Sequence, residues 1–214
     1  MGRDDMLKKI MQNHKHKIYR IVILSVVVIL SIYTVLNFNG RMIIKDNVLV
    51  KYRQGIIDDK KDLVIYIPEG VTEIMDGAFL ECNFISEINI PSSVRIIHKE
   101  AFKNCEKLKE INLPESLERI EDGAFAGCKN LSEINIPKEL VFIGESAFSE
   151  CSSLKEVFLP HTIQEIKEHT FFKCESLKSI DIPNSVTKIG AAAFLGCNSL
   201  ETVELPSSVT EIGD

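Results

Sequence analysis

The sequence predicts a repeat solenoid of the α/β class, with short parallel strands, short helical turns, a small β cap and one N-terminal transmembrane helix. Three observations carry this prediction: a period of 23 residues, strand-like alternation inside each unit, and an uncharged run of 18 residues near the N-terminus. A fixed period in the twenties indicates units that stack because none of them can bury its own apolar face alone. Such an architecture directs the search for function toward a long surface.

Three residue types keep the period without a slip. The cysteines are Cys82, Cys105, Cys128, Cys151, Cys174 and Cys197, and the phenylalanines are Phe79, Phe102, Phe125, Phe148, Phe171 and Phe194. Prolines recur at Pro68, Pro91, Pro114, Pro137, Pro160, Pro183 and Pro206. These registers predict six units over residues 68–205 and an incomplete seventh over 206–214, with the cysteines and phenylalanines as a structural ladder.

The unit 108–128 illustrates the strand predicted for each repeat. Ile111 and Leu113 alternate with Glu110 and Asn112, so the apolar pair faces inward and the polar pair faces outward.

The rest of the same unit closes the circuit. Pro114 ends the strand because it lacks a backbone donor, and Leu117 and Ile120 face inward again on the opposite wall. The segment 124–128, Ala-Phe-Ala-Gly-Cys, has the i, i+1, i+4 spacing of a single helical turn.

The block IPxSVxxIxxxAFxxCxxLxxIxI, continuous from Pro68 to Asp214, resembles the BspA-like family of leucine-rich repeat proteins, the 23-residue bacterial surface type. The resemblance implies a right-handed solenoid whose parallel strands line a concave face. It also implies a role in surface adhesion or in contacts with host and matrix. The sequence departs from the pattern at Ile85, which takes a leucine place, and at Phe158, where asparagine or an acid is usual.

Residues 21–38 carry no charge, and as a helix they would be roughly 27 Å long, about the hydrocarbon thickness of a bilayer. A basic tail, 1–20, precedes them, so we expect a signal anchor with a cytoplasmic N-terminus and an extracytoplasmic repeat domain in the cell membrane. No small-x-small site follows the run. A cleaved or soluble segment and an inverted topology are the alternatives.

The ends of the repeat array differ from its middle. In the juxtamembrane segment 39–67, three β-prone runs, 42–44, 48–52 and 63–67, predict a small antiparallel cap with a turn at Asp46 and Asn47. The unfinished repeat 206–214 would leave apolar side chains at an open end. This end predicts either a longer protein or an end-to-end contact.

Composition and motifs exclude several function classes. A net charge of -6 argues against nucleic acid as a partner. No phosphate loop, dinucleotide fingerprint, nucleophile elbow or metalloprotease motif occurs, so we predict no enzyme, no cofactor and no metal site. His98, His161 and His169 occupy variable repeat positions and are interpreted as surface residues.

The cysteine ladder allows two interpretations. Equivalent Cα atoms of stacked repeats lie about 5 Å apart, within the range that a disulfide needs. The inward position of these cysteines favours buried free thiols instead.

The outward strand positions are the best functional candidates. One column is Glu87, Glu110, Glu133, Glu156, Ser179 and Thr202, and its neighbour is Asn89, Asn112, Asn135, Phe158, Asp181 and Glu204. These columns predict a ligand face for a protein or glycan, centred on Phe158, which stands alone among polar groups as an interface anchor would. The alternatives are a merely solvated face and an envelope scaffold without a specific ligand. The opposite wall carries Glu73, Ile96, Arg119, Phe142, Glu165, Lys188 and Glu211, which we expect to add modest stability.

Overall fold

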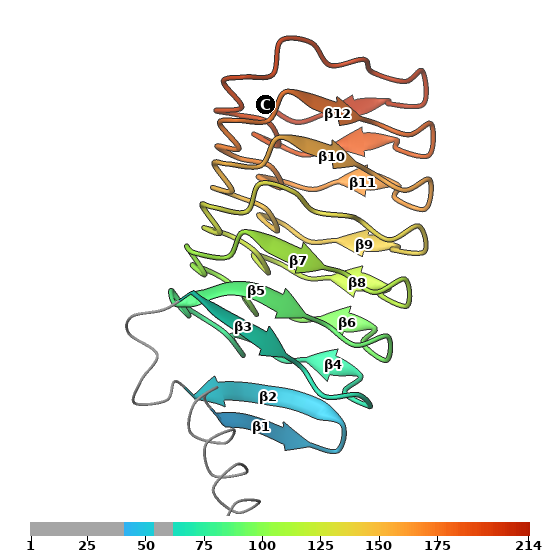
Figure 1. Ribbon diagram of the computed structural model, residues 1–214. Coiled ribbons are helices and arrows are strands. Elements are labelled where there is room, and N and C mark those ends of the chain that lie inside the picture. Colours follow the sequence, from blue (N-terminus) through green and yellow to red (C-terminus); the bar gives the residue numbers. More distant parts are fainter. Residues whose placement is uncertain (1–40, 54–61) are drawn as a thin grey trace, which may run out of the picture.

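The protein is a stack of 23-residue coils, each of which makes one circuit of the solenoid (Figure 1). The computed structural model describes residues 41–53 and 62–214. Within those residues there is no helix long and apolar enough to cross a membrane. The predicted transmembrane segment, 21–38, and the basic tail lie outside the described residues.

Two walls of short parallel strands run along the stack. The front wall consists of β3 (Leu63–Tyr66), β5 (Ile85–Asn89), β7 (Glu110–Asn112), β10 (Glu156–Phe158) and β12 (Ser179–Asp181). The back wall consists of β4 (Glu73–Ile74), β6 (Ile96–Ile97), β8 (Arg119–Ile120), β9 (Phe142–Ile143), β11 (Glu165–Ile166), β13 (Lys188–Ile189) and β14 (Glu211–Ile212). Because each strand pairs with the strand one period away, as Ile88 pairs with Ile111, the columns of the sequence become columns in space.

The third edge of each coil, which we call the turn edge, is not helical. The helical turn predicted for the Ala-Phe-x-x-Cys segment is therefore wrong, since no helix occurs among the described residues. The Phe79 N–H donates to the Ala101 carbonyl of the next coil at 2.8 Å or less, namely 2.7 Å, whereas the Cys82 N–H donates to the Phe79 carbonyl at 3.1 Å. Alternate N–H groups thus bond between coils and within a β-turn, which an α-helix does not allow.

Left-handed residues make this alternation geometrically feasible. Two positions per turn edge have positive φ, four residues apart, as at Gly123 and Gly127. Elsewhere non-glycine residues occupy these positions: Glu81, Glu100, Asn104, Ser146, Glu150, His169, Lys173 and Ala192. A side chain in this region is strained by its own Cβ, so the fold accepts local strain to keep the ladder between coils.

The N-terminal cap is smaller than the sequence predicts. β1 (Arg41–Lys45) and β2 (Val48–Arg53) form the expected antiparallel hairpin, and Asp46 and Asn47 turn it with φ of 49° and 64°. The third run, β3, is not part of the hairpin but pairs in parallel with β5. It stands one period before a repeat strand, so its outward and inward residues match those of the front wall. The hairpin therefore covers the back wall alone, where β2 pairs with β4.

The phenylalanines stack into one continuous column through the core. Neighbouring ring centroids from Phe79 to Phe194 are 5.0 to 5.7 Å apart, with planes within 11° of parallel. Phe79, Phe102, Phe125, Phe148 and Phe171 are fully buried. Tyr52 of β2 adds a ring at the first end, 5.3 Å from Phe79. The hairpin thus shields the first repeat with an aromatic of its own.

All six cysteines are free and buried. The Sγ–H of each cysteine from the second onward donates to the carbonyl of the phenylalanine in the preceding coil, at 3.1 to 3.2 Å. Each thiol is directed at a backbone oxygen and has a hydrogen-bond partner without forming a disulfide. At the far end of the stack, Leu205 and Ile212 are exposed.

Burial of the thiols sets a pH dependence of stability. Desolvation raises the pKa of Cys151 from 9.0 to about 12, and that of Cys197 to about 11. Since the folded state favours the protonated thiol, this stabilisation is complete below pH 9 and is lost as the pH rises through the folded-state pKa. We expect the free energy of unfolding, measured by urea titration, to fall above pH 9. The fall should be shallower in Cys151→Ala, and equal slopes would refute the explanation.

Strain at the turn edge is also open to measurement. Ala192 has a φ of 52°, whereas its buried neighbour Ala193 does not have positive φ. Ala192→Gly should raise the free energy of unfolding by roughly 0.5–1 kcal/mol, because the left-handed penalty exceeds the entropic cost of glycine. The matched control Ala193→Gly should lower it by about 1 kcal/mol. A loss of stability in both variants would contradict the assignment of strain.

Candidate functional site

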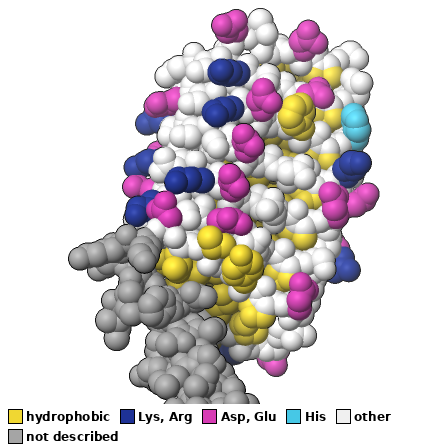
Figure 2. Space-filling view, viewed as in Figure 1, with side chains coloured by type: hydrophobic (Ala, Val, Ile, Leu, Met, Phe, Trp, Pro, Cys, Tyr) yellow, Lys and Arg dark blue, Asp and Glu magenta, His cyan; other side chains and the backbone are white. Residues whose placement is uncertain are grey.

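The two outward columns lie side by side on the front wall, in the register that the sequence predicts. Figure 2 shows acidic side chains in a line along this wall, with lysine or arginine side chains beside them. Strand pairing places Glu87 next to Glu110 and Asn89 next to Asn112, and farther along it places Glu156 next to Ser179. We call these two columns, together with Tyr66, the ligand face.

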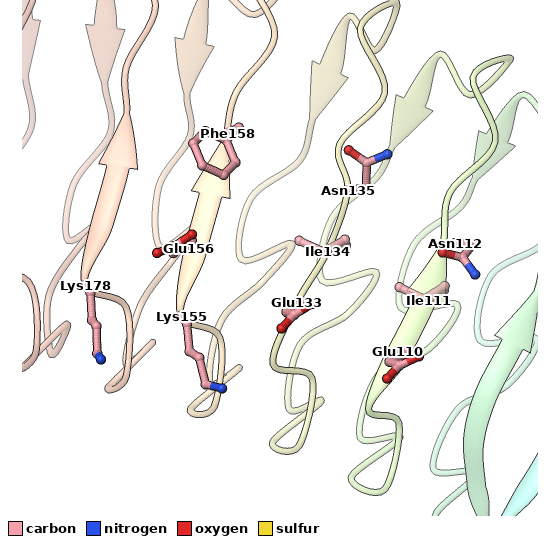
Figure 3. Close-up of a pocket in the computed structure, with 10 residues that line it drawn as sticks. All are labelled: Glu110, Ile111, Asn112, Glu133, Ile134, Asn135, Lys155, Glu156, Phe158 and Lys178. Atoms are coloured by element: carbon pink, nitrogen blue, oxygen red, sulfur yellow. The ribbon is translucent and has the colours of Figure 1, made fainter.

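A cavity of about 500 Å³ opens in the middle of the ligand face (Figure 3). Both columns line it from β7 to β10, and Lys155 and Lys178 stand at its margin beyond the glutamates. In the close-up, Glu110 and Glu133 lie on one side, Asn112 and Asn135 on the other, and Phe158 beyond the asparagines. The cavity joins carboxylates, amides and an aromatic ring along one open surface.

The cavity coincides with an interruption of the front wall. β7 ends one sheet, β10 begins another, and residues 131–137 between them form no strand. The Ser132 N–H still donates to the Lys109 carbonyl at 3.4 Å, and the Lys155 N–H to the Ser132 carbonyl at 3.2 Å. Beyond those contacts, no backbone hydrogen bond joins residues 133–136 to another described residue. Their N–H and C=O groups are therefore available to a ligand or to water.

The polar side chains of the cavity are also uncommitted. Glu133, Glu156 and Asn135 make no side-chain hydrogen bond or ion pair with any other described residue. The sequence suggests that stacked asparagines bond to one another along the column, but the Asn89 Nδ2 donates instead to Glu87 of its own coil, at 3.1 Å.

The sequence also suggests that lysines one place earlier relieve the glutamates. Lys109 is directed away from them, and its Nζ pairs with Asp62 at 3.4 Å. The carboxylates of the ligand face therefore keep their charge available for a partner.

Aromatic residues flank the row of amides. Phe158 is 65% exposed, and Tyr66 of β3 is 67% exposed. Strand pairing aligns Tyr66 with Asn89 and Asn89 with Asn112, so Tyr66 begins the column that Phe158 interrupts. Sequence reasoning missed Tyr66 because its run was assigned to the cap. Its distance of one period from Asn89 is the signal that could have found it.

The back wall has a different character. The Arg119 Cζ lies 4.0 Å from the Phe142 ring centroid, and the Lys167 Nζ lies 5.5 Å from it. Lys188 lies 3.7 Å from Glu165 and 3.6 Å from Glu211. These contacts satisfy charges within the wall itself, as stabilising cross-strand pairs do. Unlike the ligand face, this part of the back wall has its charges paired.

Comparison with known proteins agrees with the repeat architecture. The family model for the BspA type leucine rich repeat region matches six copies, over residues 63–178 and 119–214. A search of curated protein sequences finds no significant match.

Solved structures give the same result. A leucine rich cell surface protein from Faecalibacterium prausnitzii is 30% identical, with a TM-score of 0.70 over 82% of this chain and 49% of its own. A leucine rich repeat protein of T. pallidum is 26% identical, with a TM-score of 0.61 over 77% of this chain and 89% of its own. This chain thus spans about half of the first protein and most of the second. The continuous repeat, its two-walled coils and the family match together establish that the chain belongs to the BspA type leucine-rich repeat family.

Proposed function

We propose that this protein is a membrane-anchored, extracytoplasmic binding module that holds a protein or glycan ligand on its ligand face. The observation that carries the proposal is the cavity at the interruption of the front wall, with Phe158 exposed beside it. Catalysis has no part in the proposal.

An exposed phenylalanine amid polar neighbours supports binding over simple solvation. Phe158 lies in a column whose other members up to Glu204 are asparagines and acids, apart from Tyr66. Large aromatic side chains beside a partly closed cavity supply much of the binding energy at interfaces. A solvated face needs no such residue, and an asparagine would serve solubility better.

Charge suggests the chemistry of the ligand. Glu110, Glu133 and Glu156 line the cavity, and none has a described ion-pair partner. A basic or cation-bearing protein surface, or a glycan that carries amine groups, would relieve their mutual repulsion. Lys155 and Lys178 at the margin would then repel the cationic part of the ligand and fix its orientation.

The location rests on two supports. Residues 21–38 have the length and composition of a membrane anchor, and one related structure is that of a leucine rich cell surface protein. A structural envelope scaffold without a ligand is the competing function. The two differ in whether the ligand face is needed for any contact at the cell surface.

Substitution of Phe158 tests the proposed ligand face. Phe158→Ala should reduce partner capture by at least tenfold in crosslinking pull-downs from the native cell surface, because a central aromatic contributes about 1.4 kcal/mol or more. Glu133→Ala should weaken capture as well. The control Leu195→Ala removes an equally exposed apolar residue, 61% exposed, away from this face, and should have no effect.

Since Phe158 is exposed, its removal should leave thermal unfolding unchanged, which separates binding from folding. Equal capture by Phe158→Ala, Leu195→Ala and the unaltered chain would eliminate the ligand face and favour the scaffold.

Topology has its own test. Protease added to intact cells should digest the repeats, whereas a tag placed on the tail 1–20 should stay protected, because a long folded domain translocates and a short basic tail does not. Protection of the repeats with digestion of the tail would reverse the orientation. A tag on residues 1–20 that is lost from the mature protein would indicate cleavage.

A further inference from the structure

On the back wall, three carboxylates from neighbouring coils surround the His98 side chain. The Nε2 of His98 lies 2.8 Å from Oε2 of Glu73 in the preceding coil, and its Nδ1 lies 3.2 Å from Oε2 of Glu121 in the following coil. Ligand atoms of Asp76, His98 and Glu121 all lie within 4.8 Å of one another. The ring thus has a carboxylate at each nitrogen and a third carboxylate nearby.

The protein supplies too little positive charge for this group. Even a protonated His98 offers one charge against the three of Glu73, Asp76 and Glu121. Arg119 is 3.7 Å from the other oxygen of Glu121, but its guanidinium lies over the Phe142 ring.

Asp76 makes no hydrogen bond or ion pair with any other described residue. Three coils on, Lys167 stands at the periodic position of His98 and neutralises Glu165 at 3.1 Å. The row therefore carries a fixed cation at that coil, and a metal-ligating imidazole takes its place at His98.

We infer that Asp76, His98 and Glu121 bind Zn²⁺, with Glu73 as a positioning residue. Imidazole with two carboxylates suits zinc, whereas Ca²⁺ and Mg²⁺ prefer oxygen ligands alone. Two ligands bonded to zinc at about 2.0–2.1 Å in a tetrahedral arrangement lie about 3.3 Å apart. The separation of Nδ1 from the Glu121 oxygen, 3.2 Å, already fits this value.

Glu73 completes the arrangement around the ring. A nitrogen that binds metal needs its lone pair, so the proton must reside on the other nitrogen. Nε2–H donating to Glu73 fixes that tautomer and leaves Nδ1 free to bind, the arrangement in which a carboxylate supports a metal-bound histidine. Asp76 is exposed and has only to rotate toward the ion.

The site escaped prediction because its ligands are far apart in sequence. Asp76 and Glu121 lie 22 and 23 residues from His98, so only the stacking of coils brings them together. Zinc here would join three consecutive coils of the back wall. The fourth coordination position would face outward, available to water or to a donor group of a partner.

Zinc titration of the full chain in mild detergent and reductant, followed by calorimetry, tests the inference. The chain should carry His14→Gln and His16→Gln, because this pair in the tail could bind metal independently. We expect one bound Zn²⁺ per chain. His98→Gln and Asp76→Asn should each weaken binding at least tenfold, and Glu73→Gln by about tenfold, the cost of losing a supporting carboxylate.

The controls keep the result interpretable. His161→Gln replaces an exposed histidine elsewhere and should retain full affinity. Asp76→Asn disturbs no described contact, so misfolding cannot explain its loss of zinc, and zinc should raise the midpoint of thermal unfolding of the parent chain but not of this variant. Absence of binding by the parent chain, or equal affinity in Asp76→Asn and His98→Gln, would overturn the inference and leave His98 as an ion-pair partner alone.

Discussion

The hydrogen bonds and ring stacking of the turn edge hold the coils together even where both walls are interrupted. Front-wall pairing stops between β7 and β10, and back-wall pairing stops between β9 and β11. Across the same coils the Phe125 N–H still donates to the Ala147 carbonyl at 2.8 Å, and the Phe148 N–H to the Thr170 carbonyl at 2.9 Å. The buried rings of Phe125 and Phe148 remain stacked at 5.5 Å. Strained left-handed residues are tolerated at this edge because the ladder that they permit is continuous.

That constraint fixes the period and leaves the outward residues free. An insertion of one residue in a coil would break both the ladder and the stack, whereas a change at position 158 or 98 alters neither. Binding chemistry can therefore vary along the outward columns at little cost in stability. The ligand face and the zinc site use this freedom on opposite walls, with the fully buried phenylalanines between them.

Periodicity predicted what depends on the repeat and failed where structure depends on something else. Inward Ile111, outward Glu110 and the column order follow directly from spacing, and the structure confirms them. The turn at Gly123 to Cys128 was mistaken for helix because the two conformations place apolar residues similarly. They differ in backbone bonds to another coil, which spacing does not encode. β3 was misassigned because its pairing, and not its composition, makes it a front-wall strand.

The position of the cavity has a physical cause in the same outward columns. Phe158 stands at the edge of the front interruption and Phe142 at the edge of the back interruption, each where its column carries smaller or more flexible residues on neighbouring coils. Strands in register lie about 4.8 Å apart, and an outward aromatic ring needs space against its neighbours within that distance. On the back wall, Arg119 and Lys167 fill this space by stacking on Phe142. On the front wall no described side chain stacks on Phe158. The exposed ring and the unpaired backbone beside it are thus one feature, and a bound ligand would supply there what Arg119 and Lys167 supply on the other wall.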